Sequence, residues 1–387
     1  MDTKRDIVAF NKILNIFLSV MDNTLNKQQI IKRKPTLDQI ALLSGVSKAT
    51  VSRVLNNNSL VKPDVVARVQ KVIQELGYIK KRKSVDISLP FSKLTVICDD
   101  SAVASNTFYG NLLSELKQEA SKLSIQLEMS MFNQLTSPSQ ANQKLSNIEA
   151  LLILGNPNKD IVHLASKNNL PIVIINGLDP YMKTQSISPD YEFGGFMAAD
   201  YLIKNGHTKI KILTANDRHS TFQRTDGFLR ALTMSGIKYD KSDTVVDFIN
   251  YVDKVESSRN LVGNALITNP SGDFGAREIL PLLIKEKVFD NCSAVFCICD
   301  MIALSLIEAL SSVGIRVPED ISVIGFDNLA VGAISSPPLT TISTDYNKIA
   351  QTALNKLISS ISNTNKVTTT RSSVSVELIE RNSVRRI

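Results

Sequence analysis

The 387-residue chain has no tryptophan, only three histidines and four cysteines, and aromatic residues make up just 6% of it. Its cysteines (Cys98, Cys292, Cys297 and Cys299) form no Cys-x-x-Cys pair, which excludes a small disulfide scaffold and predicts reduced thiols in the cytoplasm. Zinc would need four tetrahedral ligands, and no histidine stands near the cysteine-rich run, so we expect no metal site and no cofactor. The 43% of hydrophobic residues suffice for two or three domains with proper cores, which excludes a disordered chain.

A long apolar run is also missing at the N-terminus. The mostly apolar stretch from Ile7 to Met21 is interrupted by polar residues and is shorter than the roughly 20 residues of a membrane span, so no membrane partner is expected. No small-residue cleavage site of a signal peptide follows it. Helical spacing of its apolar residues favours an amphipathic helix, and a true start at Met21 is the other possibility. We treat residues 1–34 as an extension of unknown function.

Positive charge is concentrated in one part of the chain. The net charge is +7, and residues 22–90 contain 13 Lys and Arg against 5 Asp and Glu, whereas residues 91–387 contain 28 against 30. A basic segment followed by a nearly neutral remainder is typical of a module for nucleic acid or another anionic surface joined to a different domain.

Residues 36–77 follow the pattern of three short helices. Thr36 and Gln39 form a capping box before the first helix, a Ser-Gly-Val turn ends it, and Ser47 caps the second. Pro63 begins the third helix, which stops at Gly77. Two short helices around a Gly-containing turn are a helix-turn-helix, whose second helix enters the major groove of DNA. A plain helical hairpin is the alternative, but the polar second helix and the basic flank favour DNA binding.

The outward side chains of the second helix suit particular groups on DNA. Lys48 can donate to guanine N7 and O6, while Ala49 and the methyl of Thr50 suit a thymine methyl. Ser and Asn side chains and the helix N-terminus suit phosphates, which position a protein without specifying sequence. The predicted DNA-contacting residues are Thr36, Ser47, Lys48, Ala49, Thr50, Ser52, Arg53, Asn56, Lys81, Arg82 and Ile87.

The run TLDQIALLSGVSKATVSRVLNNNSLVKPDVVARVQKVIQELGY, residues 36–78, resembles the DNA-binding domain of the LacI/GalR family of bacterial transcription regulators. The resemblance implies a following hinge helix that folds on DNA and inserts leucines into the minor groove. This sequence departs from that pattern, because four basic residues fill positions 80–83 and Ile87 stands where the leucine is expected. The basic run is predicted to bind phosphates or the minor groove, with a solvated linker as the alternative.

From Leu94 onward, short apolar runs alternate with amphipathic helical patterns, which predicts parallel sheets covered by helices on both faces. We therefore expect an all-α helix-turn-helix domain and an α/β core of two doubly wound subdomains, which by resemblance is like the periplasmic binding proteins. The predicted domains are the extension at 1–34, the helix-turn-helix at 35–79, a basic hinge at 80–92 and a two-lobed effector-binding and dimerisation domain at 93–387. Strands are expected at 94–98, 125–131, 150–154, 171–175, 210–213, 244–248, 294–298 and 321–325, and helices at 109–123, 160–167, 192–204, 222–235, 276–285 and 301–313.

Polar residues that follow the predicted strands are candidates for a ligand site, because ligands of open parallel sheets bind beyond the carboxyl ends of the strands. Asp100, Asn176 and Asp327 have this placement, and Arg224 on a helix is predicted to reach the same cleft. A carboxylate and a guanidinium in one pocket suit vicinal hydroxyls or a charged ligand group. Asp300 also follows a strand, but we expect it to cap the next helix.

The motifs GHTKIKIL (206–213), QRTDGF (223–228) and GIRVPEDISVIGFDN (314–328) resemble the effector-binding core of the same family. The resemblance implies that Arg224 and Asp327 contact the effector. It also implies that Cys299 replaces an asparagine, that Asn176 replaces an aspartate, and that two aromatic residues stand at ring-stacking positions. The predicted effector-binding residues are Asp100, Phe108, Tyr109, Asn176, Arg224, Cys299 and Asp327.

Together these patterns predict a homodimeric transcriptional repressor that binds a palindromic operator in double-stranded DNA. A small effector, either a sugar or sugar derivative or a nucleoside or nucleobase, would bind between the lobes and change the affinity for DNA. A solute-binding protein of a transport system shares such a core but lacks residues 36–78. An enzyme, for example a thiol hydrolase using Cys299, would have only His163, His207 and His219 as histidine bases, so we expect no enzymatic activity.

Overall fold

The computed structural model describes residues 36–55, 61–76, 89–98, 107–131, 143, 145–155, 159–179, 181–215, 218–254, 272–362 and 368–387. The chain divides into two compact units, residues 1–88 and residues 89–387. Several predictions fall outside the described residues: the extension at 1–34, the basic run of the hinge, and the candidate contacts Asn56, Lys81, Arg82, Ile87 and Asp100.

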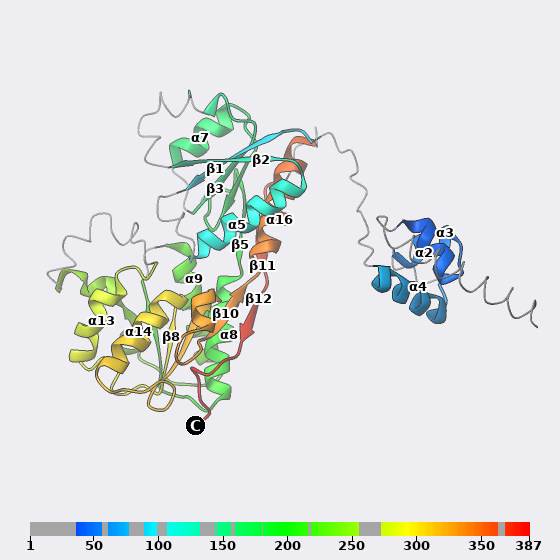
Figure 1. Ribbon diagram of the computed structural model, residues 1–387. Coiled ribbons are helices and arrows are strands. Elements are labelled where there is room, and N and C mark those ends of the chain that lie inside the picture. Colours follow the sequence, from blue (N-terminus) through cyan, green and yellow to red (C-terminus); the bar gives the residue numbers. More distant parts are fainter. Residues whose placement is uncertain are drawn as a thin grey trace, which may run out of the picture. The chain divides into compact units, whose positions relative to one another are not determined.

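Among its described residues, the smaller unit contains three helices, α2 (Leu37–Ser44), α3 (Lys48–Leu55) and α4 (Pro63–Leu76), labelled in Figure 1. The predicted capping box is present, since the Thr36 hydroxyl accepts the Gln39 N–H and the Gln39 side chain accepts the Thr36 N–H. Gly45 ends α2 with φ of +64°, a left-handed conformation that glycine adopts at little cost. The three helices share a core of Ile40, Val51, Val54 and Val69.

The larger unit has two lobes, and within its described residues each is built on a six-stranded sheet (Figure 1). The first sheet is parallel throughout, in the order β11-β5-β4-β3-β1-β2, and the second has the order β12-β10-β9-β8-β6-β7 with only β12 antiparallel to its neighbour. The strands of the first sheet are β1 (Lys93–Cys98), β2 (Gln126–Met131), β3 (Leu151–Leu154), β4 (Ile172–Ile175), β5 (Gln185–Pro189) and β11 (Arg371–Val374); those of the second are β6 (Ile210–Thr214), β7 (Val245–Asp247), β8 (Ala294–Cys297), β9 (Ser322–Asp327), β10 (Thr340–Thr344) and β12 (Val376–Ile379).

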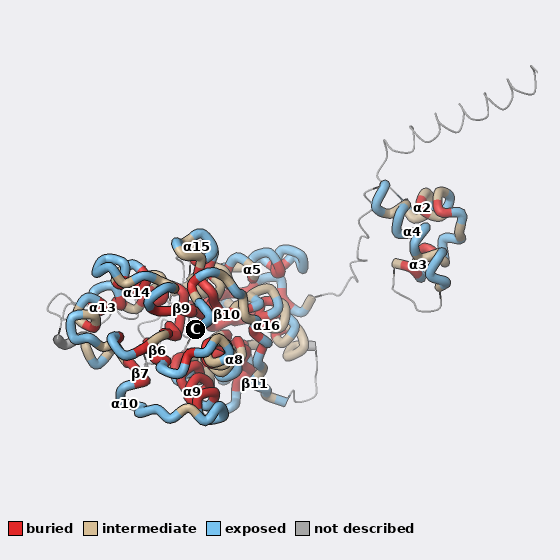
Figure 2. Tube along the Cα trace, turned by 90° about the horizontal axis from the view of Figure 1, so that it is seen from below, coloured by how far each residue is buried: buried red, intermediate tan, exposed pale blue. Residues whose placement is uncertain are grey.

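Helices cover both sheets, whose central strands are buried, while the edge strands β2, β11 and β12 and the outer faces of the helices are partly exposed (Figure 2). The first lobe carries α5 (Phe108–Lys122), α7 (Lys159–Lys167) and α16 (Tyr346–Ser362); the second carries α8 (Tyr191–Lys204), α9 (His219–Met234), α10 (Lys241–Thr244), η3 (Phe248–Lys254), α13 (Ala276–Lys285), α14 (Asp300–Ser312) and α15 (Ala330–Ala333). This is the predicted fold class, a helix-turn-helix unit and a two-sheet α/β core.

The chain passes between the lobes three times, which brings the ends of both sheets to a common cleft. It crosses from β5 to α8, returns from β10 to α16, and crosses again between β11 and β12. Asp190 stands at the first crossing, where its side chain accepts the Phe193 N–H and caps α8. The three crossings, strands β5, β10, β11 and β12, and helix α16 were not among the predicted elements.

Helices α8 and α9 pack with their backbones in contact. A Cβ added at Gly227 would overlap the backbone carbonyl of Glu192, and one added at Gly195 would overlap the carbonyl of Arg224. The two glycines therefore set the spacing of these helices, and with it the place of Arg224 at the cleft.

Candidate DNA-binding helix and effector site

Helix α3 has one buried face and one polar face. Val51 and Val54 enter the core of the small unit, while Ser47, Lys48, Ala49 and Arg53 are exposed and Thr50 and Ser52 are half-buried. The Ser47 hydroxyl accepts the Thr50 N–H at 3.1 Å and thus caps the helix as predicted. The structure therefore gives the predicted α3 side chains an outward position from which they can reach DNA.

Besides Ser47 and Thr50, two further predicted DNA-contacting residues make contacts within the small unit. Lys48 Nζ lies 2.9 Å from Asp38 Oδ2, but both side chains are more than half exposed, so the ion pair contributes little and can exchange for a ligand. The Thr36 hydroxyl is occupied by its capping interaction.

A pocket of about 790 Å³, counted with its open mouth, lies between the lobes of the larger unit. Six of the seven predicted effector residues line it, Asp100 being the one outside the described residues. They come from both lobes: Phe108, Tyr109 and Asn176 from the first, and Arg224, Cys299 and Asp327 from the second.

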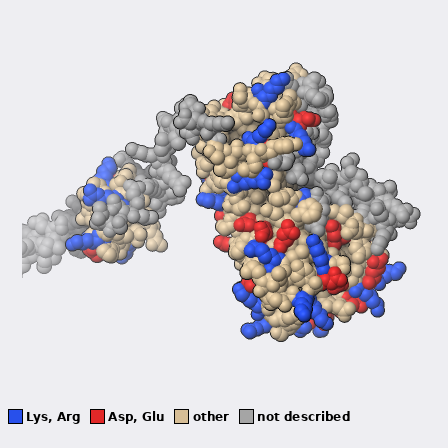
Figure 3. Space-filling view, turned by 180° about the vertical axis from the view of Figure 1, so that it is seen from behind, with Lys and Arg blue, Asp and Glu red and all other residues tan. Residues whose placement is uncertain are grey.

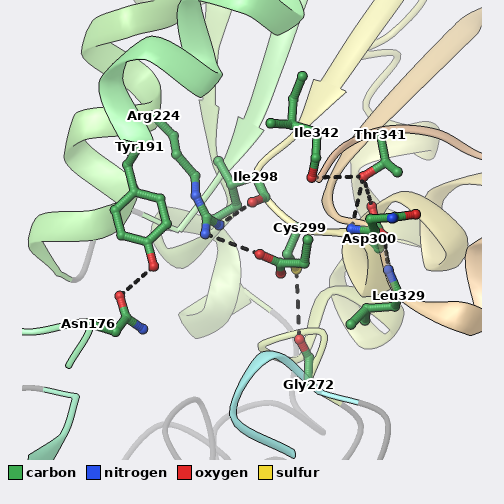
Figure 4. A network of polar contacts seen from close by, with 12 residues as sticks. Asn176, Tyr191, Arg224, Gly272, Ile298, Cys299, Asp300, Leu329, Thr341 and Ile342 are labelled. Atoms are coloured by element: carbon green, nitrogen blue, oxygen red, sulfur yellow. Dashed lines mark hydrogen bonds and ion pairs between the residues drawn. The ribbon is translucent and has the colours of Figure 1, made fainter. Parts of the chain in front are cut away.

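Arg224 is the most tightly held of these residues. Its guanidinium lies over the rings of Tyr191 and Phe326, 4.5 and 4.0 Å from their centroids, donates to the Ile298 carbonyl, and approaches Asp327 Oδ1 at 3.4 Å (Figure 4). Burial raises the pKa of Asp327 to about 6, and the positive charge of Arg224 opposes this rise. The pair thus presents a guanidinium and a carboxylate at the wall of the pocket.

Asn176 bonds to two tyrosines, Tyr109 in its own lobe and Tyr191 in the second lobe. Its amide donates to the Tyr109 hydroxyl at 2.7 Å, and its amide oxygen accepts the Tyr191 hydroxyl at 2.6 Å. Tyr191 is the first residue of α8, at one of the crossings between lobes. A ligand that displaced the contact between Asn176 and Tyr191 would therefore act directly on the connection between the lobes.

Cys299 has surroundings that disfavour catalysis. It lies at the N-cap position of α14, its thiol points to the Gly272 carbonyl at 3.8 Å, and burial raises its thiol pKa. A thiol held in its protonated form is a poor nucleophile.

His207 does not lie in this pocket, and its two ring nitrogens are bonded to Ser293 Oγ and the Arg385 carbonyl. Among the described residues, no group of three or more His, Cys, Asp and Glu is placed to hold a metal ion.

The prediction that Asp300 caps its own helix is wrong. The N-cap position belongs to Cys299, and the Asp300 carboxylate instead accepts the Leu329 N–H at 2.7 Å and the Thr341 hydroxyl at 2.5 Å (Figure 4). These bonds hold the turn after β9, where Asp327 and Asn328 have φ of +109° and +52°. Asp300 therefore supports the backbone that presents Asp327 to the pocket, a use of a strand-end carboxylate that local sequence does not reveal.

Asp300 should also make the stability of the larger unit depend on pH. Burial, and next the negative charge of Asp327, raises its pKa from 3.8 to about 8. The folded chain holds this proton more strongly than the unfolded chain, so the contribution to stability is full below pH 4, declines as pH rises and is lost above about pH 8. The free energy of unfolding of the parent, relative to Asp300→Asn, should fall from about pH 5 to pH 8. Urea denaturation of both proteins measures this difference, and a difference independent of pH would contradict it.

Several pocket residues were not predicted. Arg218, Ser220 and Thr221 begin helix α9, and Phe274 and Met301 come from other segments of the second lobe. Arg218, Ser220 and Thr221 stand at the beginning of the helix that carries the predicted Arg224. The start of that helix could therefore have indicated them as pocket residues. Phe274 lies directly before Gly275, the N-cap residue of α13, and carries no local signal.

A helix-turn-helix unit joined to a two-lobed core with a cleft between its sheets defines a ligand-responsive DNA-binding regulator. The family model for the lacI family of bacterial regulatory proteins matches residues 36–81, and that of the periplasmic binding protein-like domain matches residues 199–384. The chain thus contains a DNA-binding domain of the lacI family and a periplasmic binding protein-like domain. A transport solute-binding protein would lack the first of these domains.

The matches to curated and solved relatives extend over nearly the whole length of those relatives. The chain is 29% identical over 340 residues to the HTH-type transcriptional repressor PurR of Aliivibrio salmonicida, covering 84% of this chain and 92% of the relative. Its fold is similar to the transcriptional regulator CelR–cellobiose complex (TM-score 0.60, 23% identity, 90% and 99% coverage). It is also similar to the lac repressor dimer bound to operator and the anti-inducer ONPF (TM-score 0.57, 21% identity, 91% and 100% coverage). None of the helices described here is long and apolar enough to cross a membrane.

Proposed function

We propose that this protein is a homodimeric, cytoplasmic transcriptional repressor that binds a palindromic operator and has no enzymatic activity. The observation that carries the proposal is the combination in one chain of a helix with an exposed polar face, α3, and a pocket lined from both lobes. The repressor name of the curated relative and the operator-bound dimer among the similar structures support it. Lysine and arginine side chains of the larger unit are interspersed with acidic ones on the face seen in Figure 3, consistent with a sensor rather than a second DNA-binding surface.

The pocket is the proposed effector site. Phe108, Tyr109, Asn176, Arg224, Cys299 and Asp327 line it, and Asp100 is proposed to join them. Because the lining comes from both lobes, a ligand that binds there stabilises one relative position of the lobes and can shift the affinity for DNA. A sugar, a sugar derivative, or a nucleoside or nucleobase remains the effector class expected from the family.

The proposed DNA contacts divide into two groups. Lys48, Ala49, Thr50 and Arg53 of α3 are proposed to contact the bases, and Thr36, Ser47, Ser52 and Asn56 are proposed to contact phosphates. Lys81, Arg82 and Ile87 of the basic hinge are proposed to bind the minor groove, which would add to the salt dependence of binding.

Lys48→Ala is expected to weaken operator binding about 10- to 100-fold and to relax specificity at one base pair, because it removes the donor to a guanine edge. Binding is measured by fluorescence anisotropy at fixed salt, on an operator selected from random sequences and on its single-base variants. The matched control is Lys71→Ala, an exposed lysine on α4, which should cause a smaller loss that is equal for all sequences. Unchanged affinity and unchanged specificity for Lys48→Ala would remove it from the proposed recognition set.

A further inference from the structure

The turn after β9 presents Asp327 to the pocket in an uncommon backbone conformation. Asp327 ends β9 and lines the pocket, and it and the next residue, Asn328, have φ of +109° and +52°. Such conformations cost free energy outside glycine, and they persist where surrounding contacts hold them. The contacts that hold this turn therefore set the direction of the Asp327 carboxylate at the pocket wall.

Two of these contacts lie on either side of Asn328. The Tyr346 hydroxyl donates to the Asp327 carbonyl at 2.9 Å, and the Asp300 carboxylate accepts the Leu329 N–H at 2.7 Å. Neither contact involves Asn328 itself, which is the second of the two residues with positive φ. The middle of the turn must therefore be held by the bonds of Asn328.

Asn328 makes three hydrogen bonds. Its N–H donates to the Thr341 hydroxyl at 3.4 Å, and its side-chain amide donates to the Ser343 hydroxyl at 3.2 Å. Its amide oxygen accepts Nη2 of Arg381 at 2.7 Å. Of these three bonds, the one from Arg381 is the shortest and has an ionised donor, and charge-assisted bonds of this kind are about twice as strong as neutral ones.

Arg381 begins at the end of β12 and is itself fixed at further points. Its Nη1 donates to the Leu339 carbonyl at 2.6 Å, and its backbone N–H donates to the Thr340 hydroxyl at 3.0 Å. A planar guanidinium that bonds two acceptors at once has a defined orientation. The Arg381 side chain therefore connects the turn at Asn328 to the first residues of β10.

The segment that carries Arg381, residues 380–387, is bound to the second lobe independently of that side chain. Ser383 is fully buried, its hydroxyl donates to the Val323 carbonyl at 2.5 Å, and it accepts the Thr340 N–H at 2.8 Å. Further along, the Ile387 N–H donates to the Asn205 carbonyl at 2.9 Å. We call residues 380–387 the C-terminal strap. Because Ser383 fixes the strap to β9 and β10, Arg381 has a firm base from which to hold Asn328.

We propose that Arg381, on the C-terminal strap, is a positioning residue of the effector site, which holds Asn328 and thereby directs the Asp327 carboxylate into the pocket. Arg381 is not among the described residues that line the pocket, so it acts through the turn and not by touching the ligand. This inference rests on the proposed function, in that it takes the pocket as the effector site.

The first test measures hydrogen–deuterium exchange of the full-length protein by mass spectrometry, without ligand. In Arg381→Met, which keeps a side chain of similar length, peptides covering the turn at 327–331 should exchange about ten-fold faster, because a bond from a charged donor is lost. Peptides covering β6 should keep the parental rate. Arg381→Lys, which retains a charged donor, should restore part of the protection. Parental exchange of the turn in Arg381→Met overturns the proposal.

A double-variant cycle shows whether Arg381 acts through Asn328. Asn328→Gly tolerates the left-handed conformation but removes the acceptor, so it should speed exchange of the turn as Arg381→Met does. The double variant should exchange no faster than the quicker single variant, because both changes break the same bond. Effects that simply add would show that Arg381 stabilises the turn by another route and would overturn the proposal.

The second test measures effector affinity by isothermal titration calorimetry with ribose, glucose, cellobiose, adenine and adenosine. For each compound that binds the parent, Arg381→Met should weaken binding about ten-fold, and Arg381→Lys should weaken it less. Ser383→Ala is the structural control on the same strap: it should lower the urea midpoint of unfolding while the folded protein keeps parental affinity. Arg386→Ala, at an exposed position of the strap, should change neither property. Equal weakening in Ser383→Ala and Arg381→Met would mark a general loss of stability and overturn the proposal.

Operator binding, measured with and without each compound, separates this inference from the proposed function. If a compound changes the operator affinity of the parent and of Arg381→Met at the same concentrations, the role of Arg381 is wrong and the regulator stands. If Arg381→Met loosens the turn and weakens a compound that has no effect on operator affinity in the parent, the positioning role is supported and the proposed effector function fails.

Discussion

The Arg224→Ala variant is expected to lose about 3 to 5 kcal/mol of unfolding free energy in the larger unit, because it leaves the buried Asp327 carboxylate without its cation. The substitution also removes the guanidinium from between two aromatic rings. Urea denaturation of the parent and variant measures the loss. At an operator, the folded fraction of the variant should bind DNA with parental affinity and should not respond to effector.

Arg230→Ala is the matched control for this prediction. Arg230 also lies on α9, with its guanidinium 4.8 Å from the ring of Phe196 and 3.1 Å from Glu192, but both members of the ion pair are nearly half exposed. An exposed pair of this kind contributes about 0 to 1 kcal/mol. Equal losses for Arg224→Ala and Arg230→Ala would contradict the role assigned to the buried pair.

A double substitution separates stability from function. In Arg224→Met/Asp327→Leu, apolar side chains of similar length replace both charges, so much of the stability lost in Arg224→Ala should return. The response to effector should not return, because the pocket has lost both its carboxylate and one guanidinium. A double variant that regained the response would show that neither charged group contacts the ligand.

The Gly227→Ala variant is expected to lose about 3 kcal/mol of unfolding free energy, because its methyl group would overlap the backbone of α8 at Glu192. The helices can relieve this overlap only by moving apart, which would shift Arg224 from its place between Tyr191 and Phe326. Urea denaturation measures the loss, and weaker effector binding by the folded protein would report the shift.

Gly236→Ala gives the comparison at a glycine without such a contact. Gly236 follows α9 with φ of +70°, and a Cβ there would meet no atom within 4 Å. Replacing it with alanine should cost only the energy of holding an alanine in the left-handed conformation, about 1 to 2 kcal/mol. A loss at Gly227 no larger than that at Gly236 would indicate that the helices adjust without strain.

The sequence revealed the fold well where local signals coincide. The capping box at Thr36, the turn at Gly45 and the apolar spacing of α3 and α4 agree with one another, and all three helices lie where they were expected. The alternation of strands and helices also predicted two wound sheets. Helix α16 was missed although its buried residues Ile349, Ala353 and Leu357 have helical spacing, so that signal was present and overlooked.

What could not be predicted depends on contacts between distant segments. β11 and β12 are four residues each and partly polar, so their strand character comes from the sheets they join. Asp300 looks locally like a helix cap, and only the approach of Leu329 and Thr341 makes it a support for the turn after β9. Phe274 enters the pocket from the turn directly before α13, and no local pattern marks it as a pocket residue.

The burial of every cysteine has a practical consequence for following the protein in solution. All four thiols are shielded from solvent, and burial raises the pKa of Cys292, Cys297 and Cys299, so a cysteine introduced at the exposed Met234 should react with a maleimide dye far faster than they do. The chain also has no tryptophan, so an indole placed at Phe274 would be its single source of tryptophan fluorescence. One dye and one indole could then report on helix α9 and on the pocket without removing any native residue elsewhere.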